Sequence, residues 1–299
     1  DILKSVKIGV EKFCVSAGDD KINRNEAIKR AGITAATLIA SPLALRSSVA
    51  DEKAIFQFKQ APKGTKVVVL GGTGFVGSRV CDTLLKCGVD TVISVSRTGT
   101  APNPKITSVT ADLLTDNITT QLKGSNAVIS CIGVIGTNDA ELEKGNGEAN
   151  VRAMRQAKDA GVDRFVYVSV ASAVPSALEN FALKGYFRGK SEAERELSLA
   201  FPENSTVVRP SFIYGGDSFN VAPPRVPEGY GSFVKSILST GLIRSIAGVA
   251  PGIMKVTLSP PVAVDMVAAA CVSGALGYRE GIIDGTDAID LAAAEIKAN

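Results

Sequence analysis

Short hydrophobic runs alternate with longer amphipathic stretches from residue 66 to the end of the chain. The runs are rich in β-branched residues, as buried strands are, and the stretches have the apolar period of helices. The pattern predicts strands at 66–71, 91–96, 106–110, 127–132, 164–169 and 205–209, and helices at 75–87, 140–160, 179–200 and 262–277. Strands that alternate with helices indicate a parallel sheet covered on both faces.

The predicted fold class is therefore α/β, a doubly wound parallel sheet of the Rossmann type. After Pro210 the alternation stops in a Gly- and Pro-rich stretch that includes residues 221–227. We expect a small C-terminal lobe on the substrate side from about residue 211. The expected domains are an N-terminal extension, 1–62, and the nucleotide-binding domain with its lobe, 63–299.

The extension has the pattern of a targeting or docking segment. A helix start at 23–26 leads into an apolar run at 31–45, and small residues follow at 47–50. This order resembles a targeting segment of the thylakoid-transfer type. The run is short for a membrane span and contains Pro42, so an interfacial helix, a helix that packs on a partner and an ordinary surface helix of the domain all stay open.

A glycine turn between the first predicted strand and helix is the most specific motif. Residues 67–70 form the apolar strand, and glycines follow at 71, 74 and 77. Strand, glycine turn and helix open a dinucleotide-binding βαβ unit, in which the glycines permit a tight turn, close approach of a pyrophosphate and close helix packing. The predicted cofactor ligands here are Gly71, Thr73, Gly74, Phe75, Val76 and Gly77.

Composition excludes several kinds of chemistry. The chain of 299 residues contains no histidine, so it has no Ser-His-Asp or Cys-His nucleophile and no His-ligated metal. Its net charge of +3 comes without a basic block, and we expect no nucleic-acid partner. The five cysteines are scattered and form no C-x-x-C pair, which indicates buried thiols in a reducing compartment and no metal site.

Residues at the ends of later strands indicate how a dinucleotide is held. Ser96 and Arg97 end the second strand, where an acidic residue would select NAD and an arginine suits the 2′-phosphate of NADP. We therefore expect NADP(H) rather than NAD(H). Position in the fold places Asp112 and Leu113 near the adenine, and it places Cys131 and Gly133, which end the fourth strand, beside the cofactor.

Tyr186 and Lys190 are the candidate acid–base pair. Residues four apart share a helix face, so the phenol and the ammonium can point into one cleft. A nearby cation favours phenolate and lowers the pKa of a tyrosine. The pair could therefore donate and accept a proton at a carbonyl or alcohol.

Together these motifs resemble the extended and atypical branch of the short-chain dehydrogenase/reductase superfamily over about residues 64–290. They are most similar to the subgroup of the coenzyme-Q-associated mitochondrial protein, its plastid relatives and the Rossmann-type accessory subunit of respiratory complex I. The segments that carry the resemblance are 71–77, 94–99, 165–169, 186–190 and 208–215.

The resemblance implies roles for individual residues. Tyr186 would be the acid and base, and Lys190 the ribose ligand that activates it. The superfamily places a Ser or Thr after the fifth strand to bind the substrate carbonyl, but Val170 stands at that place here. Ser169 and Ser172 flank it and are the candidate substitutes.

Two functions follow as alternatives. One is an NADP(H)-dependent oxidoreductase that acts on a small apolar carbonyl or quinone-like substrate. The other is a catalytically silent accessory or assembly subunit that binds the nucleotide and docks on an organellar membrane complex through residues 1–60. A third reading is a Rossmann domain without a nucleotide. The extension and the resemblance favour a plastid, thylakoid-associated location, with the mitochondrion as the alternative.

Overall fold

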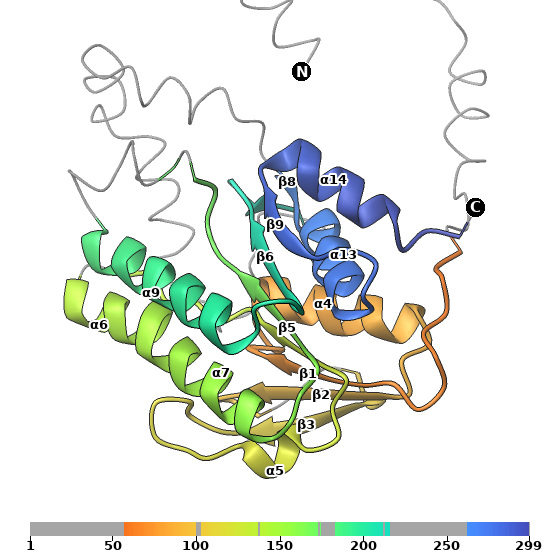
Figure 1. Ribbon diagram of the computed structural model, residues 1–299, viewed down its shortest axis with the longest axis horizontal. Coiled ribbons are helices and arrows are strands. Elements are labelled where there is room, and N and C mark those ends of the chain that lie inside the picture. The colour runs from red at the N-terminus through yellow and green to blue at the C-terminus, as the bar shows by residue number, and fades with distance from the viewer. Residues whose placement is uncertain are drawn as a thin grey trace, which may run out of the picture. The chain divides into compact units, whose positions relative to one another are not determined.

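The fold is built on a seven-stranded parallel sheet with the strand order β3-β2-β1-β4-β5-β6-β9 (Figure 1). The computed structural model describes residues 57–99, 103–136, 138–172, 174, 183–211, 213–215 and 262–298. The strands are β1 (Lys66–Leu70), β2 (Thr91–Ser96), β3 (Ile106–Thr110), β4 (Ala127–Ser130), β5 (Arg164–Val168), β6 (Ser205–Arg209) and β9 (Gly281–Asp284). This confirms the doubly wound α/β fold and each of the predicted strands.

Helices cover both faces of the sheet. Helices α4, α13 and α14 lie on one face, and α6, α7 and α9 lie on the other (Figure 1). The helices are α4 (Phe75–Lys86), α5 (Thr119–Leu122), α6 (Asp139–Glu143), the π-helical η2 (Lys144–Glu148), α7 (Ala149–Asp159), α9 (Lys184–Ala200), α13 (Val264–Ala275) and α14 (Thr286–Ala294). A separate pair, β7 (Ile213–Tyr214) and β8 (Val262–Ala263), forms a small parallel sheet.

Three predicted helices differ from the observed ones. The helix expected at 140–160 is divided into α6, η2 and α7, with two glycines, Gly145 and Gly147, inside the π-helical turn. The helix expected at 262–277 begins at residue 264, because 262–263 pair as β8. Helix α9 begins at residue 184, and residues 179–182 of the predicted helix lie outside the described ranges.

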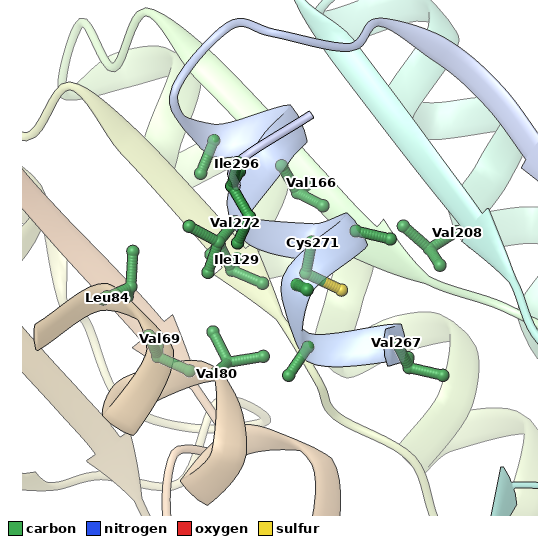
Figure 2. Packing of buried hydrophobic residues seen from close by; sticks show 14 of the residues in the cluster. Val69, Val80, Leu84, Ile129, Val166, Val208, Val267, Cys271, Val272 and Ile296 are labelled. Carbon is green, nitrogen blue, oxygen red and sulfur yellow. The ribbon is translucent and has the colours of Figure 1, made fainter. Parts of the chain in front are cut away.

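Each sheet face has its own apolar core. The face under α4 and α13 buries Val69 of β1, Ile129 of β4 and Cys271 of α13 in one cluster (Figure 2). The opposite face buries Phe165 and Tyr167 of β5 against α7 and α9. Alternate residues of each central strand supply the two cores, as expected for a sheet that is buried on both faces. The two cores fix the sheet on which the site is built.

The described part of the N-terminal extension pairs with the end of the domain. Phe58 forms an antiparallel bridge with Lys297, and the Lys59 amide donates to the carbonyl of Ile296 at 2.8 Å. The predictions for residues 1–56 and for a lobe within 216–261 fall outside the described residues. Within the described ranges, no helix has the length and apolar composition needed to cross a membrane.

Candidate nucleotide-binding and catalytic site

The predicted site residues gather at the carboxyl edge of the sheet. Strands β1 and β4 are neighbours, and the chain leaves this pair in opposite directions, to β2 and β3 on one side and to β5 and β6 on the other. Loops diverge at such a switch point and leave a crevice in which open α/β sheets bind ligands. Because every strand is parallel, the residues after β1, β2, β4 and β5 share this edge.

The turn after β1 can be made only with glycine at two of its positions. Gly71 has a φ of +77°, and its carbonyl accepts a hydrogen bond from the Gly74 amide at 2.9 Å. A Cβ on residue 77 would lie 2.8 Å from the Gly71 carbonyl carbon and closer still to its oxygen. The structure therefore explains both glycines by backbone geometry: helix α4 packs directly on the turn.

The N-terminus of α4 is suited to an anion. Its N-cap is Gly74, which offers no side-chain acceptor, and the first turn has no acidic residue. The first N–H groups and the positive end of the helix dipole, at Phe75, Val76 and Gly77, thus lack a charged partner from their own helix. Such an end binds the pyrophosphate of a dinucleotide.

The loop after β2 carries the candidate phosphate ligands. The Ser96 hydroxyl accepts a hydrogen bond from the Gly99 amide at 3.1 Å and shapes the loop. Arg97 is exposed, and no salt bridge among the described residues includes it. Thr73 and Thr98 bring their hydroxyl oxygens within 3.3 Å, so the glycine turn and this loop are in contact.

In the loop after β3, the candidate residues Asp112 and Leu113 form hydrogen bonds that hold the loop in its conformation. One carboxylate oxygen of Asp112 accepts the Leu114 amide at 3.0 Å. The Leu113 side chain is buried in the core, and its carbonyl accepts a hydrogen bond from Arg152 at 3.1 Å. Asp112 is half-buried, in the loop that follows β3 at the carboxyl edge of the sheet.

Tyr186 and Lys190 both lie on α9 and are close in space. The Lys190 ammonium lies 5.7 Å from the centroid of the Tyr186 ring. It donates hydrogen bonds to the carbonyls of Val168, the last residue of β5, at 2.8 Å, and of Ile132, in the loop after β4, at 3.3 Å. The lysine thus ties the helix to the edge of the sheet at the switch point.

Close helix packing sets the position of this pair. Gly185 and Gly189 alternate with Tyr186 and Lys190 along α9 and lie against α6 and η2. A Cβ on residue 189 would lie 2.7 Å from the amide nitrogen of Gly147. The glycines bring α9 onto its neighbours, while the tyrosine and lysine occupy adjacent positions of the helix.

Burial governs the electrostatics of the site. Lys190 is almost fully buried, which lowers its pKa from 10.5 to about 8. Desolvation disfavours the ammonium, and the nearby Glu194 opposes that effect only in part. Burial also raises the pKa of the Cys131 thiol, so Cys131 beside the cleft is a neutral thiol and a poor nucleophile.

The two candidate serines have different environments. Ser169 is 5% exposed, and its hydroxyl has no hydrogen-bond partner within the described part of the chain. Ser172 is exposed. Val170 and Tyr186 both pack against a small apolar cluster that contains Phe187. A buried hydroxyl without a partner is unfavourable unless a ligand or water completes it, which makes Ser169 the stronger candidate.

Sequence reasoning missed a buried asparagine that holds the loop after β4. The Asn146 amide accepts the Val134 N–H at 3.1 Å and donates to the Val134 and Leu142 carbonyls at 2.9 and 2.8 Å. Gly133 lies next to the Asn146 side chain, since a Cβ at this position would be 3.3 Å from the Asn146 side-chain oxygen. The available signal was a pair of asparagines four residues apart, Asn146 and Asn150, inside an otherwise apolar helix face.

The parallel sheet, the glycine turn after β1 and the helix end without a side-chain cap are features of dinucleotide-binding α/β proteins. A family described as NAD(P)H-binding matches residues 71–230, and the chain belongs to that family. Among the described residues, no group of three or more His, Cys, Asp or Glu could hold a metal ion.

Two curated relatives come from organelles. The chain is 43% identical to an uncharacterised chloroplastic protein of Arabidopsis thaliana over 53% of this chain and 54% of the relative. It is 35% identical to the mitochondrial protein FMP52 of Meyerozyma guilliermondii over 50% of this chain and 66% of that protein. The matched regions thus span about half to two thirds of the length of these relatives.

Solved structures share the fold. A UDP-N-acetylglucosamine 4-epimerase from Methanobrevibacter ruminantium matches with a TM-score of 0.53 and 18% identity, over 76% of this chain and 77% of the other. The Bordetella bronchiseptica enzyme WbmF, solved with NADH, matches with a TM-score of 0.54 and 16% identity, over 78% and 76%. At this identity the likeness shows that the chain shares the fold of these proteins and nothing further about its role.

Proposed function

We propose that the protein binds NADP(H) and reduces a carbonyl or quinone-like apolar substrate. The observation that carries the proposal is that Lys190, which lies 5.7 Å from the Tyr186 ring, donates a hydrogen bond to the carbonyl of Val168, the residue before Ser169. The Ser169 hydroxyl is buried and has no hydrogen-bond partner among the described residues. The glycine turn lies at the same edge of the sheet. The family resemblance supports an apolar substrate. The Phe- and Pro-containing segment 211–227 supports it too, although most of that segment lies outside the described residues.

The residues present fit the nucleotide. A Cβ at residue 77 would clash with the backbone of Gly71, so helix α4 begins close to the turn, and its end offers N–H groups to phosphate. Asp112 would bind the adenine, and Lys190 the nicotinamide ribose. When bound, the reduced nicotinamide supplies a hydride to the carbonyl carbon.

The protein's own groups handle the oxygen and the proton. The Ser169 hydroxyl donates a hydrogen bond to the substrate oxygen and orients it. As the C=O π electrons move to oxygen, the Tyr186 phenol gives its proton to that oxygen, the alcohol forms, and solvent returns a proton to the phenolate. A protonated Lys190, 5.7 Å from the ring, stabilises the phenolate.

The preference for NADP(H) over NAD(H) is the finer part of the proposal. Arg97 is exposed at the end of β2 with no salt bridge in the described part of the chain, and Ser96 replaces the acidic residue that would repel a 2′-phosphate. A guanidinium binds phosphate with two parallel hydrogen bonds. We propose an organellar location, plastid and thylakoid-associated, because the first relative is chloroplastic; the mitochondrion is the alternative.

The second candidate function is nucleotide binding without catalysis. Lys190 already donates to two backbone carbonyls, and Val170 occupies the place of the usual hydroxyl residue. These observations favour a silent accessory or assembly subunit of an organellar membrane complex, stabilised by bound nucleotide and docked through residues 1–60.

A reductase assay separates the two candidates. NADPH oxidation is followed with a panel of quinones and aliphatic and aromatic carbonyls, for the wild type, Tyr186→Phe and Ser169→Ala. For an enzyme we expect turnover with at least one acceptor, and a loss of about 10²-fold or more in kcat for Tyr186→Phe with unchanged NADPH affinity. NADPH binding without turnover on any acceptor would support the silent subunit.

A further inference from the structure

Arg209 joins two carboxylates at the edge of the candidate site. Arg209 ends β6 and stands opposite Asp284, which ends β9, in the parallel register. Its guanidinium binds both oxygens of Glu194 on α9, with 3.0 Å from Nε to Oε1 and a second bond from Nη2 to Oε2. A third nitrogen, Nη1, lies 3.5 Å from Asp284 Oδ2. All three side chains are half-buried, so solvent screens these contacts less than it would on an open surface.

Asp284 also holds the segment that follows β5. Its Oδ1 accepts a hydrogen bond from the Ser172 amide at 3.2 Å. The same segment is bonded to the end of β6 and to the residue that follows it: Ser169 N donates to Val208 O at 2.8 Å, and Ala171 N donates to Pro210 O at 2.9 Å. The Asp284 carboxylate thus fixes the far end of the segment on which both candidate serines lie.

The network reaches the helix that carries the acid–base pair. Glu194 is one helical turn beyond Lys190 and two turns beyond Tyr186, so the three residues follow one line along α9. Arg209 therefore connects that line of α9 to β6, to β9 and, through Asp284, to the serine segment. These contacts join residues up to 112 positions apart in the chain.

We propose that Arg209 and Asp284 are positioning residues that set the serine segment 169–172 against helix α9. The inference rests on the proposed function, because it gives the network the task of aligning a hydroxyl with the phenol of Tyr186. Neither residue contacts the reacting atoms. They act through Ser172 and Glu194, and misplacement of a reacting group by about 1 Å reduces turnover about 10²-fold.

A second ion pair in the same sheet provides a matched control. Arg164, at the start of β5, binds Glu280, just before β9, at 2.5 Å. It too links the β5 and β9 regions, but it lies at the amino edge, away from the site. A purely stabilising role would be common to both pairs, and a positioning role belongs only to the pair at the carboxyl edge.

The test compares Asp284→Ala, Asp284→Asn and Glu280→Ala in the full chain. Amide hydrogen exchange in 169–172 is measured together with kcat, KM and NADPH affinity on the best acceptor from the panel. We expect Asp284→Ala to speed exchange in 169–172 at least about tenfold, with β1 unchanged, and to lower kcat about 10- to 100-fold at constant NADPH affinity. Asp284→Asn retains an oxygen for the Ser172 amide and should restore slow exchange, and Glu280→Ala should change neither quantity.

The outcomes separate this inference from the proposed function. If the wild type turns over no acceptor but exchange in 169–172 still responds only to Asp284→Ala, the proposed reductase fails and the positioning contact stands. The positioning inference is overturned if exchange and kcat in Asp284→Ala match the wild type, or if Glu280→Ala has the same effects. Should Asp284→Ala not fold, Arg209→Lys takes its place, with faster exchange and lower kcat expected because lysine cannot bind Glu194 with two nitrogens.

Discussion

At the glycine turn, the room available for a Cβ atom determines which residue can stand at a position. Gly77 lies inside α4, where alanine is normally preferred over glycine by about 1 kcal/mol. A Cβ at this position meets the backbone of Gly71, which cannot move without opening the turn. The steric conflict therefore outweighs the helix preference, and the residue is determined by its neighbour across the turn.

Gly77→Ala should lower the free energy of unfolding by about 1–3 kcal/mol and weaken NADPH binding. Urea unfolding and NADPH titration measure the two effects. Gly136→Ala is the control, because a Cβ there meets no atom within 4 Å. Equal stability of the Gly77→Ala variant and the wild type would show that α4 does not pack on the turn as described.

Lys190 gives the protein a pH-dependent stability. Between pH 8 and 10.5 the unfolded chain keeps a proton on this amine that the folded protein has released. The unfolded state binds more protons, so the free energy of unfolding rises with pH in this window and the Lys190 contribution is constant below it. Relative to Lys190→Met, the wild type should gain a few kcal/mol across the window, at about 1.4 kcal/mol per pKa unit.

Urea unfolding of both proteins at intervals from pH 7 to 10.5 measures this gain. Subtracting one free energy of unfolding from the other cancels the contribution of the cysteines and tyrosines, which both proteins share. A difference that does not change with pH would mean that the amine is not desolvated in the folded state.

At the scale of elements, the division of one predicted helix into α6, η2 and α7 has a local cause. Asn146 lies in the π-helical turn and uses its side chain to bind the loop after β4. A chain of buried polar contacts continues from Asn146 through Asn150 to Ser130, with 2.9 Å from Asn150 Nδ2 to Asn146 O and 2.6 Å from Ser130 Oγ to Asn150 Oδ1. Helix geometry is thus adapted to a hydrogen-bond network.

Asn146→Ala should therefore destabilise the fold by about 2–4 kcal/mol, because it removes three hydrogen bonds to backbone groups that are buried at Leu142 and partly buried at Val134. Asn138→Ala, which removes the exposed N-cap of α6, should cost about 1 kcal/mol. Chemical denaturation of the two variants tests the contrast. Similar losses in both would mean that the Asn146 contacts add nothing beyond an ordinary cap.

Local patterns predicted the elements whose cause lies within a few residues. The β1–α4 turn was predictable because its tight backbone contacts require glycine in the sequence itself. Strand β9 was not, because it has four residues, one of them the exposed Ile282, and it pairs with β6 more than 70 residues earlier. The ion pairs of Arg209 were not predictable for the same reason, because its partners lie on two elements that are distant in the chain. Each of these charged residues, taken alone, has the sequence pattern of a surface residue.

For the whole molecule, the parallel order of the sheet is what unites the site. The site is assembled from four separate regions of the chain: the glycine turn, the loop after β2, Lys190 and Ser169. These regions lie at the same edge because all strands of the sheet run in the same direction. Sequence could indicate this edge from the alternation of strands and helices. The hydroxyl geometry around Tyr186 depends on side-chain packing across β5, β6 and α9, which no local pattern reports.

The most direct test of the account is nucleotide binding by the whole protein. Thermal unfolding is measured with NADPH and with NADH, for the wild type and for Arg97→Asp. We expect NADPH at about 100 times its Kd to stabilise the wild type by about 2.7 kcal/mol, a rise in Tm of about 5–10 °C, with a weaker effect of NADH. Arg97→Asp should remove the preference for NADPH. An unchanged Tm with both nucleotides would contradict the cofactor site on which the account depends.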